Sequence, residues 1–262
     1  MSFFSSWEPV HNPISVLGWL EDQEDPLTGY WAPSVFEDST WILHAMYQDE
    51  SLLGLGTHDD VEKESIRRGL RGADVVGGID LSAATVDSGT PLGWAERPDG
   101  PWKRLRWREH FGPAMDATLD RRPWPPNDAA LRSGQSWSAS ISAPPEGSLD
   151  EASLDALVDV LAGVGGAAAP ILAFYGQVPA NNYESPTLLV GGLDSIGELV
   201  DQFGSTPSNL WPADRSWFVM TDWDITSTCL WGPTALVHGV RQHDDLETVD
   251  WAPPQHVSGA HE

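Results

Sequence analysis

The spacing of apolar residues is regular in the second half of the chain and predicts two amphipathic helices there. One run keeps the i, i+3, i+4, i+7 spacing of a single helix face through Leu154, Leu157, Val158 and Leu161. The same spacing recurs over 196–203, and glycines that can end a helix follow both runs. Each run begins with the serine-to-glutamate spacing of a capping box: Ser148 with Glu151, and Ser195 with Glu198.

The densest run of strand-forming residues, 216–224, predicts a central strand. Alternation places Val219 on one face and its neighbours Phe218 and Met220 on the other. Because neither face is polar throughout, we expect this strand to be covered on both sides. A short connection leads to a second apolar run at 226–231, so the two runs together predict a hairpin.

Further strands and helices alternate along the chain. Helices are predicted to begin near Pro13, Asp59 and Pro233, and strands are predicted at 40–47, 75–86, 92–97, 102–108, 136–141, 171–175, 188–190 and 246–251. The C-terminal half then contains three successive β-α-β units. We predict an α+β fold with a mixed, mostly antiparallel sheet and helices packed on one face, loosely ferredoxin-like in the C-terminal half.

A stretch rich in proline and polar residues, 113–147, marks a candidate domain boundary. It divides the chain into an N-terminal α+β region, 1–132, and a C-terminal α+β region, 133–262. The sequence leaves open whether these two regions form one continuous domain.

The chain is strongly acidic, and its charge is unevenly distributed. The formal net charge is −25. Residues 1–62 hold twelve acids without a lysine or arginine, and residues 133–262 hold seventeen acids with two arginines. Such a field repels nucleic acid and anionic membranes and attracts a basic protein partner. The alternative is that the charge only keeps the protein soluble.

The sequence predicts a cytoplasmic protein. It shows no basic-then-apolar leader and no apolar run long enough to span a membrane. The single cysteine, Cys229, excludes an internal disulfide framework, and we expect it to be a small buried hydrophobe. His44 lies in an apolar run and is predicted to be a core histidine rather than a ligand.

The Asp-x-Asp at Asp222 and Asp224 is the first candidate site. Two carboxylates at a strand end project the same way and can hold Mg²⁺ or Mn²⁺, so a divalent metal is a candidate cofactor. The alternative is that the acids are solvated or cap a turn. Together with Trp223 they are also candidate contact residues for a basic partner, because tryptophan is a frequent interface anchor.

The second candidate site is the chain's one basic cluster. Arg104, Arg106 and Arg108 alternate with Leu105 and Trp107, a pattern that can bind a phosphate or another anion. The alternative is that these arginines pair with a neighbouring acidic surface.

The segment 207–232, PSNLWPADRSWFVMTDWDITSTCLWG, resembles a group of actinobacterial proteins that carry Trp-Pro-x-Asp-Arg-Ser-Trp and Thr-Asp-x-Asp ahead of a terminal helix and strand. The resemblance extends to Gly147-Ser148-Leu149 and His11-Asn12-Pro13, and it implies no catalytic residues. By general type the chain is also similar to acidic bacterial immunity proteins, which neutralise toxins.

Three functions follow as hypotheses. The first is a cytosolic protein-binding protein without enzymatic activity, such as an immunity or inhibitor protein for a basic partner. The second is a metal-assisted enzyme for a phosphorylated or nucleotide substrate, which would use Asp222 and Asp224 for the ion and Arg104, Arg106 or Arg108 for phosphate. The third is a structural subunit of an assembly. The sequence fixes neither the oligomeric state nor the identity of a partner.

Overall fold

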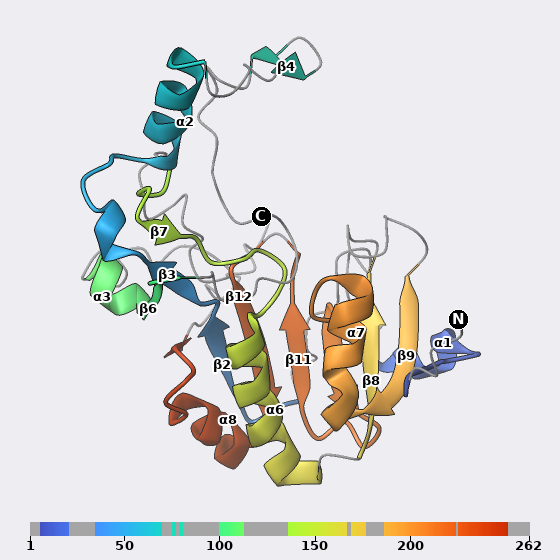
Figure 1. Ribbon diagram of the computed structural model, residues 1–262. Helices are drawn as coiled ribbons and strands as arrows, with labels where there is room; N and C mark the ends of the chain where they lie inside the picture. The colour runs from blue at the N-terminus through green and yellow to red at the C-terminus, as the bar shows by residue number, and fades with distance from the viewer. Residues whose placement is uncertain are drawn as a thin grey trace, which may run out of the picture.

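A large antiparallel sheet forms the centre of the protein (Figure 1). The computed structural model describes residues 6–20, 35–69, 75–76, 79–80, 100–112, 136–166, 169–176, 186–223 and 225–250. The sheet has eight strands in the order β1-β9-β8-β10-β11-β12-β2-β13, and all of its described pairs are antiparallel. These strands are β1 Glu8–Pro9, β2 Asp38–Leu43, β8 Pro170–Tyr175, β9 Thr187–Gly192, β10 Asn209–Pro212, β11 Phe218–Thr221, β12 Ser227–Gly232 and β13 Thr248–Val249.

Three helices pack on one face of this sheet: α6 Glu151–Gly165, α7 Ile196–Phe203 and α8 Thr234–Arg241 (Figure 1). The other described helices are α1 Pro13–Leu17, η1 Gly18–Leu20, η2 Glu50–Leu52, α2 His58–Arg67, α3 Trp107–Phe111 and η5 Leu193–Ser195, which leads into α7. A three-stranded sheet joins β6 Lys103–Leu105, β3 Met46–Gln48 and β7 Ile141–Ser142. A two-stranded ribbon joins β4 Val75–Val76 to β5 Ile79–Asp80. The predicted α+β class, with a mostly antiparallel sheet and helices on one face, is confirmed.

Two of the helices cross over an intervening strand. Strand β8 pairs antiparallel with both β9 and β10, so β9 and β10 run parallel and α7 connects them. Strand β2 pairs antiparallel with both β12 and β13, so these two also run parallel, and α8 connects them. Each is a split β-α-β unit. The first of the three predicted β-α-β units is wrong, because β7 before α6 belongs to the three-stranded sheet and β8 after α6 belongs to the large one.

Alternation along the strands separates two hydrophobic clusters on the two faces of the sheet. In β8, Ile171 and Ala173 face the helices, whereas Leu172 and Phe174 face the opposite cluster. In β11, Val219 faces the helices, and its neighbours face the other side. The second cluster is covered by η1, α3 and the segment around Trp137 and Ile141. Strand β11 is therefore central and covered on both faces. It pairs antiparallel with β12, and the predicted hairpin is confirmed.

Strands from the first 132 residues lie within the same sheet as strands from the rest. Strand β2 lies between β12 and β13, and β1 pairs with β9. Arg241, the last residue of α8, donates to both carboxylate oxygens of Asp38, at 2.7 and 3.0 Å, and to Asp250 at 2.8 Å. This ion pair lowers the pKa of Asp38 and fastens α8 to the start of β2.

Two predicted strands are much shorter than expected, for different local reasons. In 136–141 only Ile141 is in a strand, because Ser138 and Ser140 bond each other and the amide of Ile141 bonds the carbonyl of Ser138, which makes a turn. In 102–108 the strand ends at Leu105, because the carboxylate of Glu247 accepts the amides at the start of α3.

Other strand predictions hold in part. The run 40–47 divides into β2 and β3, which belong to different sheets. The run 75–86 begins with the short pair β4 and β5, and 246–251 contains only the two residues of β13. The predicted strand at 92–97 lies outside the described residues.

Both predicted capping boxes are wrong. Asp150, not Ser148, precedes α6, and the Ser148 hydroxyl instead accepts the amide of Thr206 at 3.0 Å. Ser195 precedes α7 without a side-chain cap, and Glu198 instead accepts the amide and hydroxyl of Ser6. In both cases the side chain that was predicted to cap the helix instead accepts a hydrogen bond from a residue distant in sequence.

Helices long and apolar enough to cross a bilayer do not occur in the part of the chain that the structure describes.

Candidate functional site: an acidic helical face and an adjoining pocket

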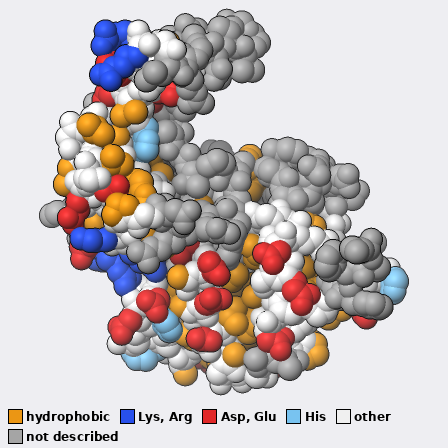
Figure 2. Space-filling view, in the orientation of Figure 1, with side chains coloured by type: hydrophobic (Ala, Val, Ile, Leu, Met, Phe, Trp, Pro, Cys, Tyr) orange, Lys and Arg blue, Asp and Glu red, His pale blue; other side chains and the backbone are white. Residues whose placement is uncertain are grey.

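The exposed sides of α6 and α7 each carry a row of carboxylates. On α6 the row has i, i+4, i+8 spacing and consists of Glu151, Asp155 and Asp159. From η5 through α7 the row has i, i+4, i+7 spacing and consists of Asp194, Glu198 and Asp201. All six residues are exposed, and in Figure 2 acidic side chains stand in two columns over these helices. We call these six residues the acidic face.

The acidic face contains no basic counterpart. Neither α6 nor α7 has a lysine or arginine, and the only ones in residues 133–262 are Arg215 and Arg241. Arg241 is engaged by Asp38 and Asp250, and Arg215 lies 4.9 Å from the ring centroid of Trp19. Like charges three or four residues apart on a helix destabilise it slightly, so neighbouring carboxylates of each row repel one another along the helix.

An open pocket adjoins the N-terminal end of the acidic face. It encloses about 530 Å³ and is lined by Tyr47, Lys103, Arg104, Asp150, Glu151, Ala152, Asp155 and Asp245. Glu151 and Asp155 belong both to this pocket and to the acidic face, so the two features are continuous. The described lining holds four carboxylates and two cations and is therefore net negative.

Asp150 is the unusual member of this pocket. It is only 2% exposed and is the N-cap residue of α6, yet its side chain makes no capping hydrogen bond. Its Oδ2 accepts the Tyr47 hydroxyl at 3.2 Å, and its Oδ1 is buried with no hydrogen-bond donor among the residues that the structure describes. A buried carboxylate oxygen without a donor is costly, and native structures rarely retain one without a reason.

The cations of the pocket are both engaged by groups of the chain itself. Lys103 Nζ donates to Glu50 at 3.1 Å, and Arg104 Nη2 donates to the buried hydroxyl of Ser153 at 3.3 Å. The carboxylates of Glu151, Asp155 and Asp245, in contrast, form no ion pair with any described residue.

The three arginines of the predicted anion site make separate contacts. Arg104 bonds Ser153, Arg106 donates to the carbonyl of Asp244, and the backbone amide of Arg108 donates to Glu247 at 3.1 Å. The amide of Trp107 donates to the same carboxylate at 2.8 Å. A carboxylate of the chain therefore already occupies the start of α3, where an anion would bind. Anion binding by these arginines stays a prediction.

The predicted metal and contact residues follow the central strand β11. Asp222 and Trp223 are partly buried, and the carbonyl of Asp222 accepts the amide of Ile225 at 3.4 Å, as in a turn. Asp224 lies outside the described residues, so metal binding by this pair stays a prediction. Among the side chains that are described, no three of His, Cys, Asp or Glu are placed to hold a metal ion.

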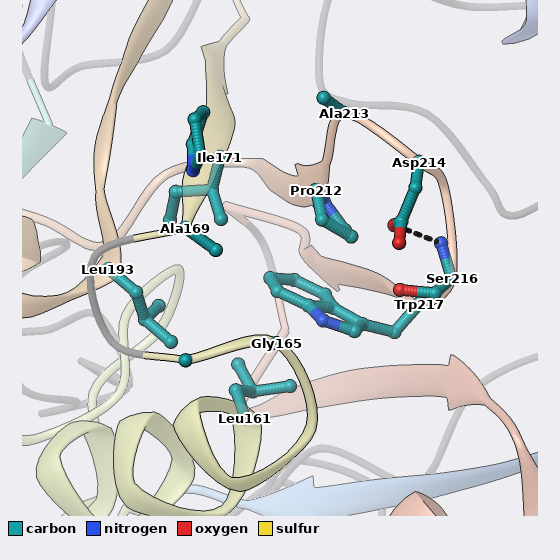
Figure 3. Close-up of a pocket in the computed structure, with 12 residues that line it drawn as sticks. Leu161, Gly165, Ala169, Ile171, Leu193, Pro212, Ala213, Asp214, Ser216 and Trp217 are labelled. Atoms are coloured by element: carbon teal, nitrogen blue, oxygen red, sulfur yellow. Dashed lines mark hydrogen bonds between the residues drawn. The ribbon is translucent and has the colours of Figure 1, made fainter.

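A second, smaller pocket lies at the opposite end of α6 (Figure 3). It encloses about 230 Å³, and its walls are mainly apolar, with Leu161, Leu193 and the indole of Trp217 facing one another. The Asp214 carboxylate stands at its rim and accepts the amide of Ser216 at 3.0 Å. The only described carboxylate of this pocket is thus used in a local turn.

His44 and Cys229 are core residues, as predicted. His44 is fully buried and bonds the Pro145 carbonyl at 2.6 Å and the Thr228 hydroxyl at 2.9 Å. Burial lowers the pKa of His44 to about 4. Burial also raises the pKa of the Cys229 thiol, which therefore stays protonated and unreactive at neutral pH.

Comparison of the chain with protein-family models, curated proteins and solved structures gives no match. The acidic face could have been found from the sequence, since its two rows follow the spacing of residues on one helix face. The pocket could not, because its lining comes from four segments far apart in the chain.

Proposed function

We propose that the protein is a cytosolic binding protein for a basic partner protein, such as an immunity or inhibitor protein, and that the acidic face is its contact surface. The observation that carries the proposal is the pair of carboxylate rows, three exposed acids on α6 and three on η5 and α7, which have no lysine or arginine. A face of one sign steers a partner of the opposite sign during association.

The internal repulsion of this face supports the same proposal. Solubility needs a net charge but not a segregated one, and a mixed surface supplies it without loss of helix stability. Neither α6 nor α7 carries any of the chain's 14 lysines and arginines, of which 12 lie in residues 63–132. Natural proteins commonly retain such local destabilisation at surfaces that bind another molecule.

The test begins with capture of a partner on the tagged protein from its native cytosol at low salt, identified by mass spectrometry. The affinity and association rate of the purified partner are then measured at ionic strengths of about 0.01 M and 0.15 M, between which the Debye length falls from about 30 to about 8 Å. We expect a basic protein of fixed stoichiometry whose association rate falls on the order of tenfold across this range.

A matched pair of variants separates the acidic face from net charge. The double variant Asp159→Asn, Asp201→Asn removes two charges from the face, and Glu109→Gln, Asp214→Asn removes two exposed charges elsewhere. The face variant should associate more slowly than the control variant. Equal rates for the two, or a complex insensitive to salt, would contradict the proposal.

A further inference from the structure

We propose that the pocket at the start of α6 receives one basic side chain of the partner, a guanidinium or primary ammonium group, with Asp150 as its principal acceptor. This inference rests on the proposed function and makes it more specific: the acidic face attracts the partner, and the pocket anchors it. Three observations carry the inference, namely the unpaired Asp150 oxygen, the charge of the lining and the size of the pocket.

The Asp150 side chain is the first observation. At 2% exposed it is almost completely removed from water, and one of its two carboxylate oxygens has no donor among the described residues. Its other oxygen has a single neutral donor, the Tyr47 hydroxyl. A cationic N–H donor placed beside Asp150 satisfies the unpaired oxygen and neutralises the buried charge at once, in the strongest class of hydrogen bond.

The charge of the pocket selects a cation over an anion. Its two cations are already held by Glu50 and Ser153, while Glu151, Asp155 and Asp245 have no cationic partner among the described residues. An anion entering the pocket would approach four carboxylates, whereas a guanidinium can meet two of them with its fork of donors.

The shape of the pocket selects an organic cation over a metal ion. The described carboxylates here are not grouped closely enough to coordinate an ion, but about 530 Å³ lies within the size range of pockets that hold small organic groups. Glu151 and Asp155 line the pocket and also belong to the acidic face, so a protein that lies on the acidic face places its side chains beside the pocket. In protein interfaces a few buried anchor residues supply most of the binding energy, and the surrounding charges mainly raise the association rate.

The experiment uses the full chain and small probes. The first probe is Nα-acetyl-arginine amide, followed by NMR of the ¹⁵N-labelled protein, with the citrulline analogue as its uncharged counterpart. We expect the arginine probe to shift the amides of Lys103, Ser153 and Asp245, and the citrulline probe to leave them in place. Equal shifts with both probes, or none with the arginine probe, would overturn the inference.

The second measurement uses a fluorescent hexa-arginine peptide and follows its affinity by anisotropy. Asp150→Asn keeps an acceptor for Tyr47 and a good N-cap but removes the charge, and we expect it to weaken binding about tenfold or more. If this variant unfolds, the exposed pair Asp155→Asn, Asp245→Asn replaces it and should weaken binding as well. An affinity unchanged in whichever of these variants folds would overturn the inference.

The two proposals fail in distinguishable ways. If Asp159→Asn, Asp201→Asn weakens binding of the captured partner but Asp150→Asn does not, the acidic face binds and the pocket is not an anchor. If no basic partner is captured and the hexa-arginine peptide still requires Asp150, the pocket binds a cation and the proposed function is wrong.

Discussion

At the scale of single residues, His44 belongs to a buried chain of hydrogen bonds that makes the stability of the protein depend on pH. The Pro145 carbonyl can only accept, so Nδ1 of His44 carries the proton and Nε2 accepts from Thr228. The Thr228 hydroxyl in turn lies 2.9 Å from that of Thr221. Every group in this hydrogen-bond chain is satisfied by the neutral imidazole. Burial lowers the pKa of His44 by more than the Pro145 carbonyl and the charge of Asp150 raise it.

The lowered pKa of His44 predicts a loss of stability in mild acid. The unfolded chain takes up a proton near the ordinary value of 6.5, and the folded state only near 4. The contribution of His44 to the free energy of unfolding is therefore complete above pH 6.5, and about 3 kcal/mol of it is lost as the pH falls from there to about 4. Urea denaturation across this range should show a steeper decline for the wild type than for His44→Asn. The control variant at an exposed histidine, His238→Asn, should lose stability with falling pH as the wild type does. If the stability of His44→Asn falls with pH as steeply as that of the wild type, the prediction is wrong.

Gly147, three residues before Asp150, lies in a turn that requires glycine. Its φ of +70° suits glycine, and a Cβ there would lie 2.8 Å from the Cα of Trp223. Because the clash is with backbone, Gly147→Ala should cost about 2 kcal/mol or more in the free energy of unfolding. The matched control is Gly163→Ala, whose Cβ meets nothing within 4 Å, and it should stabilise α6 by about 0.5–1 kcal/mol. Urea denaturation of both variants checks the pair, and a neutral Gly147→Ala would mean that the turn can move away.

At the scale of secondary structure, α6 combines a well-packed inner side with an outer side under electrostatic strain. Leu154, Leu157 and Leu161 are at most 3% exposed on its inner side. On its outer side, Asp155 lies four residues from both Glu151 and Asp159. Packing against the sheet thus stabilises α6, whereas the repulsion between its surface carboxylates destabilises it.

The strain on α6 predicts that removing a charge stabilises the protein. Asp155→Asn ends two like-charge i, i+4 repulsions and should raise the free energy of unfolding by roughly 0.5–1 kcal/mol at low ionic strength. The gain should shrink in high salt, where exposed charges are screened. Urea denaturation at two salt concentrations measures both effects. A destabilised Asp155→Asn at low salt would show that Asp155 has a structural role.

The elements that could be predicted from the sequence were those with a local cause. The apolar stripe over 196–203 gave α7, and the glycine after it, Gly204, ends the helix with a left-handed φ of 75°. The predicted helix caps failed because Ser148 and Glu198 bond Thr206 and Ser6, and such distant partners leave no local pattern. The pocket was missed for the same reason: Tyr47, Arg104, Asp150 and Asp245 converge only in the folded chain.

At the scale of the whole molecule, the two halves that the sequence suggested contribute to the same cores. Ile42 and Trp7 belong to the cluster under the helices, and Trp41 and Leu20 belong to the cluster on the opposite face. All the other described members of the first cluster come from beyond residue 132. Strand β2 lies between β12 and β13 and pairs with both, so β13 joins the large sheet only through β2.

This shared architecture predicts one folding unit rather than two. For the full chain, unfolding followed by tryptophan fluorescence and by far-UV circular dichroism should give coincident transitions. The fragments 1–132 and 133–262 should each lack a cooperative transition when expressed alone. Fragment 133–262 loses β2 from the edge of β12 and loses Leu20, Trp41 and Trp107 from the second cluster, and fragment 1–132 holds only two described members of the first cluster. Co-expression should restore a complex with the spectrum of the intact protein. If 133–262 alone unfolds cooperatively at the same urea midpoint as the full chain, the prediction is wrong, and β1 and β2 are additions to a domain that folds without them. That domain would then contain both the acidic face and Asp150, the N-cap residue of α6.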